Sequence, residues 1–277
     1  MQKMNEKDLT EKIKQLSKLD LSKVDITIDY LKMQIGEVIE PLLEMVIGAN
    51  FPKVYRARIN EDKKSFPNIK DLWYPDKEKI KKLGRFNAIH EQMFYCGTHQ
   101  LIATSEINAQ VGDVVSVMEC ELKEPKRKLK VPNIFLNDYK SIPGISVNVE
   151  PIEKHNKAHS ILKTHENIKK FTLIQKFLES ESLKKVRIGE EYNYKISVIV
   201  KEILFARGDL DGLCYPSIAV DKEGINIVLS PDAIDKYYFP TKVLVFEKIL
   251  INNEEYFQLI NQSTLIDSTS GSIMYEL

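Results

Sequence analysis

The sequence lacks the motifs that mark the commonest nucleotide-binding and metal-binding proteins. It contains no GxGxxG loop, no P-loop and no HExxH pair. It also has no CxxC pair, and its three cysteines, Cys96, Cys120 and Cys214, are an odd number in apolar surroundings. We therefore expect buried, reduced thiols, and we expect neither a Rossmann cofactor site nor a cysteine-based metal site.

The histidines do not change this expectation for metals. His155 and His159 are four residues apart, with His165 nearby, and such a spacing could hold zinc on a helix. No thiol or HExxH partner accompanies them, so the alternative of solvated or capping histidines is favoured. The sequence predicts no metal site.

Net charge is also absent, because forty Lys and Arg balance forty Asp and Glu. No long-range field would attract nucleic acid or an anionic membrane, so an anionic ligand has to be held by local residues. The longest apolar stretches are short or interrupted by charge, and the first twenty residues have no apolar core of the signal-peptide kind. We expect a cytoplasmic protein that spans no membrane.

The N-terminal part of the chain has the spacing of helices. From Asp25 to Ala49 the apolar residues recur at helical intervals, interrupted at Pro41. Together with the charged segment before it, this pattern predicts a helical N-terminal extension over 1–48. Its apolar positions need a partner surface, either the rest of the chain or a second copy.

The remainder of the chain mixes strands and helices without a regular βαβ alternation, which favours an α+β domain. The expected C-terminal β-hairpin pairs two long strands across the Asn-Asn-Glu turn at 252–254. Strands are expected at 51–59, 92–97, 111–122, 211–219, 225–230, 241–251 and 254–263, helices at 99–110, 151–185 and 192–206, and loops at 64–84 and 124–151.

Three residues attract attention as candidate site residues, and each also has a plain structural explanation. Arg85 follows Gly84 where a loop enters a strand, and it could be a solvated turn residue. Tyr95 lies in an apolar strand, where an aromatic residue is commonly part of the core. Glu106 falls in a short helix, and an acidic residue in the first turn of a helix would have a favourable interaction with the helix dipole. None of them alone indicates a function.

Taken together, these residues belong to the first of two blocks that resemble the RES domain, a family named for its Arg, Glu and Ser. The first block is GRFNAIHEQMFYCGTHQLIATSE, with Arg85, Tyr95 and Glu106 at spacings of ten and eleven. The second is DGLCYPSIAVDKEGINIVL at 211–229, which contains Ser217. The resemblance covers 51–240, and the chain departs from it at 88–90, where the family often has a Pro- or Gly-containing turn.

This resemblance implies a fold similar to the ADP-ribosyltransferases: a mixed, largely antiparallel β core with flanking helices. It also implies cleavage of NAD⁺ at the nicotinamide–ribose bond, with NAD⁺ as substrate and no metal. Glu106 would stabilise the developing oxocarbenium ion, as a carboxylate does in glycoside hydrolysis. Tyr95 would stack on the cationic nicotinamide, and Arg85 would bind the pyrophosphate.

Three further residues are carried over as substrate-binding. Arg56, in VYRAR, lies where the family often has a strand arginine and would assist Arg85. The Ser217 hydroxyl would donate a hydrogen bond to the ribose or the amide. Asn87 completes the family's Gly-Arg-aromatic-Asn pattern.

The expected organisation is a helical extension over 1–48, a RES-like catalytic domain over 49–240 and a C-terminal β-hairpin over 241–277 that packs on it. Two functions remain open. The first is an NAD⁺ glycohydrolase, phosphorylase or mono-ADP-ribosyltransferase, acting as a growth-inhibiting toxin with an antitoxin or a protein acceptor as partner. The alternative is a RES-like module that binds a nucleotide or a partner without turnover. A homo-oligomer is compatible with either.

Overall fold

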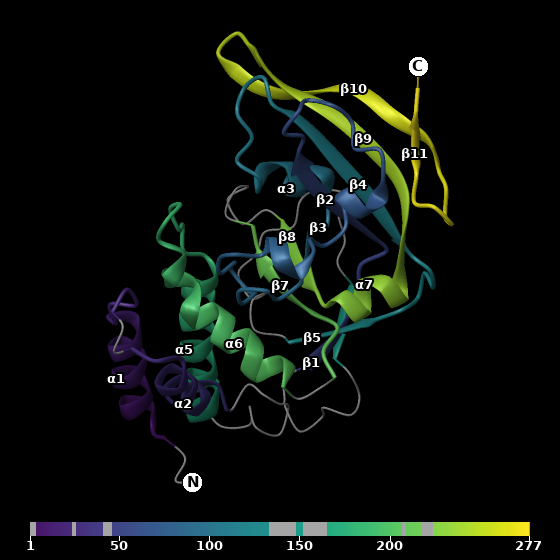
Figure 1. Cartoon of the computed structure of the whole chain (residues 1–277). Helices are drawn as coiled ribbons and strands as arrows, with labels where there is room; N and C mark the ends of the chain where they lie inside the picture. The colour runs from purple at the N-terminus through teal and green to yellow at the C-terminus, as the bar shows by residue number, and fades with distance from the viewer. Residues whose placement is uncertain are drawn as a thin grey trace.

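A computed structural model describes residues 4–23, 26–40, 46–132, 148–151, 165–206, 209–217 and 224–276. Its centre is an eight-stranded antiparallel sheet in the order β11-β10-β9-β4-β2-β3-β8-β7 (Figure 1). The strands are β2 (Lys53–Ile59), β3 (Phe94–Gly97), β4 (Val114–Leu122), β7 (Gly212–Pro216), β8 (Ile225–Leu229), β9 (Tyr238–Ile251), β10 (Glu254–Ile266) and β11 (Ile273–Tyr275). With helices on its flanks, this sheet confirms the predicted α+β class.

The predicted C-terminal hairpin is confirmed as β9 and β10. Its turn residues, Asn252 and Asn253, have φ angles of 53° and 65°. Two left-handed residues are what a two-residue hairpin turn requires, and Asn tolerates that conformation. β9 also pairs with β4 from Tyr238 to Glu247, so the predicted boundary at 240/241 falls inside a strand of the main sheet.

The N-terminal helices pack on two later helices at the β7 side of the sheet (Figure 1). They are α1 (Glu6–Ser17) and α2 (Ile28–Ile39), and they lie against α5 (His165–Ser182) and α6 (Lys195–Phe205). One apolar core joins all four helices to the face of β7 and β8. The sequence predicts α6 as a helix despite its Val and Ile residues, and the structure confirms it.

A second, three-stranded sheet in the order β5-β1-β6 corrects the sequence prediction in three places. β1 (Val46–Asn50) is a strand where the helical extension was expected to continue to residue 48. β5 (Leu129–Pro132) and β6 (Asn148–Pro151) lie in the segment expected to be a loop. Pairing across the sheet makes these segments strands, because a short apolar run has no periodicity long enough to define its own secondary structure.

The remaining elements position loops around the sheet. They are α3 (Gln100–Ser105), α7 (Pro231–Tyr237), which the sequence did not predict, and short 3₁₀ helices η2 (Ile69–Asp71), η3 (Lys77–Lys79) and η5 (Glu191–Tyr194). The expected helix at 151–185 is wrong at its start, because Pro151 belongs to β6, and it is confirmed over α5, His165–Ser182. Residues 152–164, with His155 and His159, lie outside the described part.

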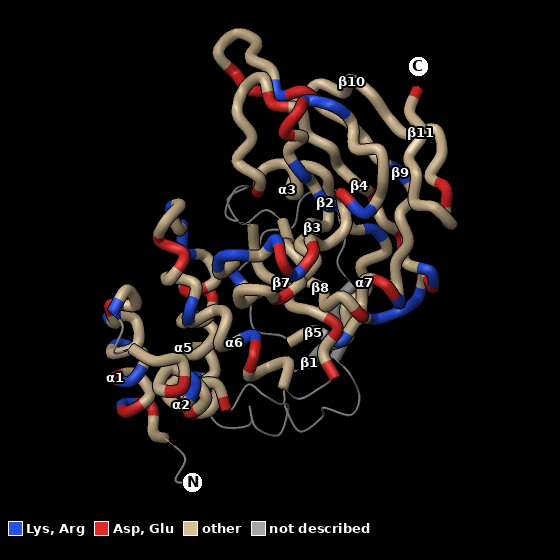
Figure 2. The backbone as a smooth tube through the Cα atoms, viewed as in Figure 1, with Lys and Arg blue, Asp and Glu red and all other residues tan. Residues whose placement is uncertain are grey.

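Basic and acidic residues are interspersed along the described backbone (Figure 2). In the described ranges, no helix combines the length and apolarity needed to cross a bilayer. The same ranges hold no group of three or more His, Cys, Asp or Glu side chains arranged to bind a metal ion.

Candidate active site

The candidate site lies where two neighbouring strands of the main sheet separate. β2 and β3 pair at a single position, Tyr55 opposite Gly97, whereas β2 pairs with β4 along its whole length. A cavity of about 370 Å³ opens at this point. Four predicted site residues, Arg56, Arg85, Tyr95 and Glu106, are among those lining it, together with Tyr55, Ala57, Cys96, Ala103, Ile107, Tyr194, Tyr215 and Asn226.

Glu106 is held in a fixed orientation by two neutral donors. Its Oε1 accepts a hydrogen bond of 2.6 Å from Ser217 Oγ and another of 2.6 Å from Asn226 Nδ2. Within the described residues no donor to Oε2 is found. The carboxylate is therefore oriented by β8 and the end of β7 while it still lines the cavity.

The position of Glu106 also rules out the explanation that this residue stabilises the first turn of a helix. The residue is the C-cap of α3, not part of its first turn. A negative charge at a helix C-terminus is opposed by the helix dipole. Its placement beside Ser217 and Asn226 therefore needs another reason than helix stability.

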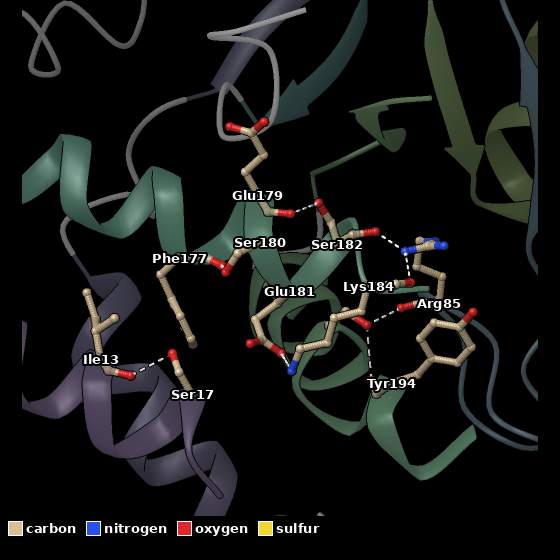
Figure 3. A network of polar contacts seen from close by, with 11 residues as sticks. Ile13, Ser17, Arg85, Phe177, Glu179, Ser180, Glu181, Ser182, Lys184 and Tyr194 are labelled. Atoms are coloured by element: carbon tan, nitrogen blue, oxygen red, sulfur yellow. Dashed lines mark hydrogen bonds and ion pairs between the residues drawn. The ribbon is translucent and has the colours of Figure 1, made fainter. Parts of the chain in front are cut away.

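Arg85 binds the C-terminal end of α5 (Figure 3). Its Nη1 donates to the backbone carbonyls of Ser182 and Lys184, the latter at 3.1 Å. The guanidinium also lies 5.4 Å from the ring centre of Tyr194 and 5.7 Å from that of Tyr215. A cation at a helix C-terminus and between aromatic faces is stabilised by both, so Arg85 is fixed before any ligand arrives.

Tyr95 is locked by the loop that carries Arg85. Its hydroxyl donates to Asn87 Oδ1 at 2.9 Å and accepts from the Phe86 N–H at 2.9 Å. Burial raises the pKa of Tyr95 well above its usual value, so the phenol stays neutral. The ring thus forms a rigid wall of the cavity and cannot swing away from it.

Gly84 shows why this loop begins with Gly-Arg. A Cβ at Gly84 would lie 2.0 Å from Asn87 Oδ1, so any side chain there would displace the group that binds Tyr95. Asn87 itself lines a smaller neighbouring cavity of about 210 Å³, which lies beyond Tyr95 and Arg56. Asn87 therefore contacts the main cavity only through Tyr95.

Arg56 bridges the gap between the separating strands. Its Nη1 donates to the Tyr95 carbonyl at 3.0 Å, and its guanidinium lies 5.3 Å from the ring centre of Phe94. Burial lowers the pKa of Arg56 to about 10, which still leaves it charged at neutral pH. Arg56 lines both cavities and is a second cation beside the same space as Arg85.

The cysteine in the cavity wall is not a nucleophile. Cys96 is buried, and burial raises the pKa of its thiol far above neutrality, so the reactive thiolate does not form. All three cysteines are free and buried, which confirms the prediction of reduced thiols.

The structure thus brings Arg56, Arg85, Tyr95 and Glu106 to one cavity. Ser217 and Asn87 are not among its lining residues, but Ser217 contacts Glu106 and Asn87 contacts Tyr95. Sequence reasoning did not select three aromatic residues of the cavity wall, Tyr55, Tyr194 and Tyr215, and it gave no role to Asn226, the second donor to Glu106. The second RES-like block contains Asn226 shortly after Gly224, and this placement is its signal in the sequence. The tyrosines carry no such signal, because their shared cavity exists only in the fold.

This arrangement combines one oriented carboxylate, two fixed guanidinium groups and aromatic walls. A carboxylate can stabilise a cation that forms next to it, and the guanidinium groups can bind an anion. The aromatic faces suit a flat, cationic ring. The site therefore fits a ligand that carries both an anionic part and a cationic aromatic part.

Comparisons with known proteins add a limited finding. No protein-family model matches the sequence, and no curated protein matches it. Among solved structures, this chain is similar in fold to a chain in the crystal structure of the M. tuberculosis MbcT–MbcA toxin–antitoxin complex. The TM-score is 0.34 and the sequence identity 9%, over 74% of this chain and 90% of that chain. At that TM-score the function has to be argued from the site itself.

Proposed function

We propose that this protein consumes NAD⁺ by cleaving the bond between nicotinamide and ribose. The observation that carries the proposal is the Glu106 carboxylate, which Ser217 and Asn226 orient beside a cavity that also holds two arginines. The RES-like blocks of the sequence point to the same residues. A module that only binds a nucleotide has no need of a carboxylate held against a cation.

The reaction explains why these groups share one cavity. When the glycosidic bond breaks, its electron pair leaves with nicotinamide, which becomes neutral, and the ribose C1′ becomes oxocarbenium-like. Glu106 would stabilise that developing positive charge, and its fixed orientation removes the cost of reorganising it during the reaction. An acceptor oxygen, from water, phosphate or a protein side chain, then bonds to C1′ and loses its proton to solvent.

The other residues would bind the two ends of NAD⁺. Arg85 commits Nη1 to the carbonyls of Ser182 and Lys184, so its remaining N–H groups and Arg56 are the donors for the pyrophosphate. The faces of Tyr95, Tyr194 and Tyr215 would exclude water and contact the nicotinamide ring. Consumption of NAD⁺ would make the protein growth-inhibiting, and an antitoxin partner would then be needed to restrain it.

The test is to incubate the purified protein with NAD⁺, with and without inorganic phosphate and with candidate protein acceptors, and to identify the products by mass spectrometry. We expect nicotinamide in every active reaction. ADP-ribose, ADP-ribose phosphate or a modified protein would then identify the acceptor. If NAD⁺ bound but no nicotinamide formed under any acceptor condition, the protein would be a binding module instead.

A further inference from the structure

Helix α6 carries two polar side chains on its buried face. Ser197 is 3% exposed and Lys201 only 2% exposed. They are four residues apart and so lie on one side of the helix, one above the other. Other buried residues of α6, Ile196, Ile199, Val200 and Leu204, pack into the core shared with α2 and α5. The polar pair therefore faces something other than that core.

The pair faces the loop that carries Arg85. Ser197 Oγ donates a hydrogen bond to the Arg85 carbonyl, and Lys201 Nζ forms an ion pair with Glu91 Oε1. Glu91 uses its other oxygen, Oε2, to accept the Ala88 N–H at 2.7 Å. One helix face thus holds both ends of the loop at 85–91, which in the following we call the arginine loop.

A buried lysine is an uncommon way to stabilise a fold. Removing an ammonium and a carboxylate from water costs free energy that their attraction often does not exceed, and an apolar pair of similar size is frequently as stable. Lys201 is nearly fully buried, whereas the Glu91 side chain is 36% exposed and lines the smaller cavity. The pair therefore has another role than global stability, and its directional contact with the arginine loop identifies that role.

We propose that Lys201, through Glu91, is a positioning residue that fixes the arginine loop in the conformation the active site requires. The inference rests on the proposed function for its catalytic consequence only. The contacts run from Lys201 to Glu91, from Glu91 to Ala88, and from the adjacent Asn87 to the Tyr95 hydroxyl. Lys201 thereby sets the position of a cavity wall that it does not touch.

The experiment compares two double variants that each remove one ion pair of α6 without leaving an unpaired charge. The pair variant is Glu91→Gln with Lys201→Met, which keeps an acceptor for the Ala88 N–H. The control is Glu202→Gln with Lys32→Met, which removes the 2.8 Å ion pair between α6 and α2. The control alters the next residue of the same helix and leaves the arginine loop untouched. Both are measured for Tm, for hydrogen exchange of the amides at 86–91 and for NAD⁺ kinetics.

We expect the pair variant to keep a Tm close to that of the wild type, because no charge is left buried and unpaired. Exchange at 86–91 should become at least about tenfold faster, and kcat/KM should fall by about 100-fold, the loss typical of misplaced binding groups. KM should rise together with the fall in kcat, since Arg85 and Tyr95 contact bound substrate. The control should match the wild type in all three measurements.

Two results would overturn the proposal. The first is unchanged exchange at 86–91 in the pair variant. The second is a pair variant that unfolds while the control stays folded, because the pair would then serve global stability. Hydrogen exchange needs no substrate, so it tests the anchoring of the loop even if the wild-type protein consumes no NAD⁺ and the proposed function fails.

Discussion

Glu106 is the residue whose charge matters most in the proposed reaction. Glu106→Gln keeps the size of the side chain and an oxygen acceptor for Ser217 Oγ and Asn226 Nδ2, but it removes the negative charge. Because the cation it would stabilise exists mainly in the transition state, we expect kcat to fall by about 100- to 1000-fold. The Tm and the affinity for NAD⁺ should change little.

The matched control for this prediction is Glu121→Gln. Glu121 is a carboxylate on β4 that pairs with Lys53 and does not line the cavity. It should leave NAD⁺ consumption unchanged. Wild-type turnover by Glu106→Gln would refute the assignment of the carboxylate, whatever the control does.

At the scale of the elements, the end of α5 and the candidate active site share one side chain. Arg85 binds the carbonyls of Ser182 and Lys184 and also lines the cavity. A lysine has a single ammonium, so it can satisfy the helix end but cannot reach the cavity as well. We expect Arg85→Lys to keep most of the stability and to lose most of the NAD⁺ turnover.

Arg85→Ala separates the two roles, because it removes the helix contact too. Leaving those carbonyls unsatisfied should lower the free energy of unfolding by about 1 to 3 kcal/mol. Urea denaturation of both variants, beside NAD⁺ kinetics, measures the difference. Equal stability of Arg85→Lys and Arg85→Ala would mean that the helix contact has no energetic weight.

At the scale of the whole molecule, the N-terminal helices complete the core. On α2, Leu31 is fully buried, whereas Met33 is 56% exposed. Leu31→Ala should lower the free energy of unfolding by about 2 to 5 kcal/mol, the cost of a buried cavity. Met33→Ala, two residues away, should lower it by about 0.5 kcal/mol or less. Thermal or urea unfolding compares the two, and equal effects would mean that α2 does not cover the core.

The raised pKa values of several tyrosines predict how the stability of the fold responds to alkaline pH. Burial raises the pKa of Tyr55 and Tyr74 to about 12, and it raises the pKa of Tyr95 and Tyr215 well above the usual value. In the unfolded chain these phenols ionise near pH 10. The native state therefore holds protons that the unfolded state loses, so stability is fully present below pH 10 and falls as the pH rises towards 12.

Phenolate absorbance and near-ultraviolet circular dichroism, followed together, test this expectation. The buried tyrosines should ionise in one step that coincides with unfolding. Their gradual titration near pH 10 with the fold intact would contradict it.

The sequence by itself determined the features that depend on neighbours along the chain. Strand-like composition predicted β2, β4 and the β9–β10 hairpin, because β-branched side chains pack well against their neighbours in a sheet. The two asparagines at the turn predicted its position through their tolerance of positive φ. The sequence also supplied the candidate residues of the site, since Arg85, Tyr95, Glu106 and Ser217 lie in the two blocks that resemble the RES domain.

Only the tertiary structure decided the features that depend on partners far away in the chain. Residues 46–50 form a strand because β5 and β6 pair with them on either side. Glu106 received its donors from residues 111 and 120 positions away. Lys201, in a helix that reads as apolar, was buried against Glu91. Such contacts have no local signature, because a buried polar group is defined by the partner that satisfies it, and the fold alone brings that partner near.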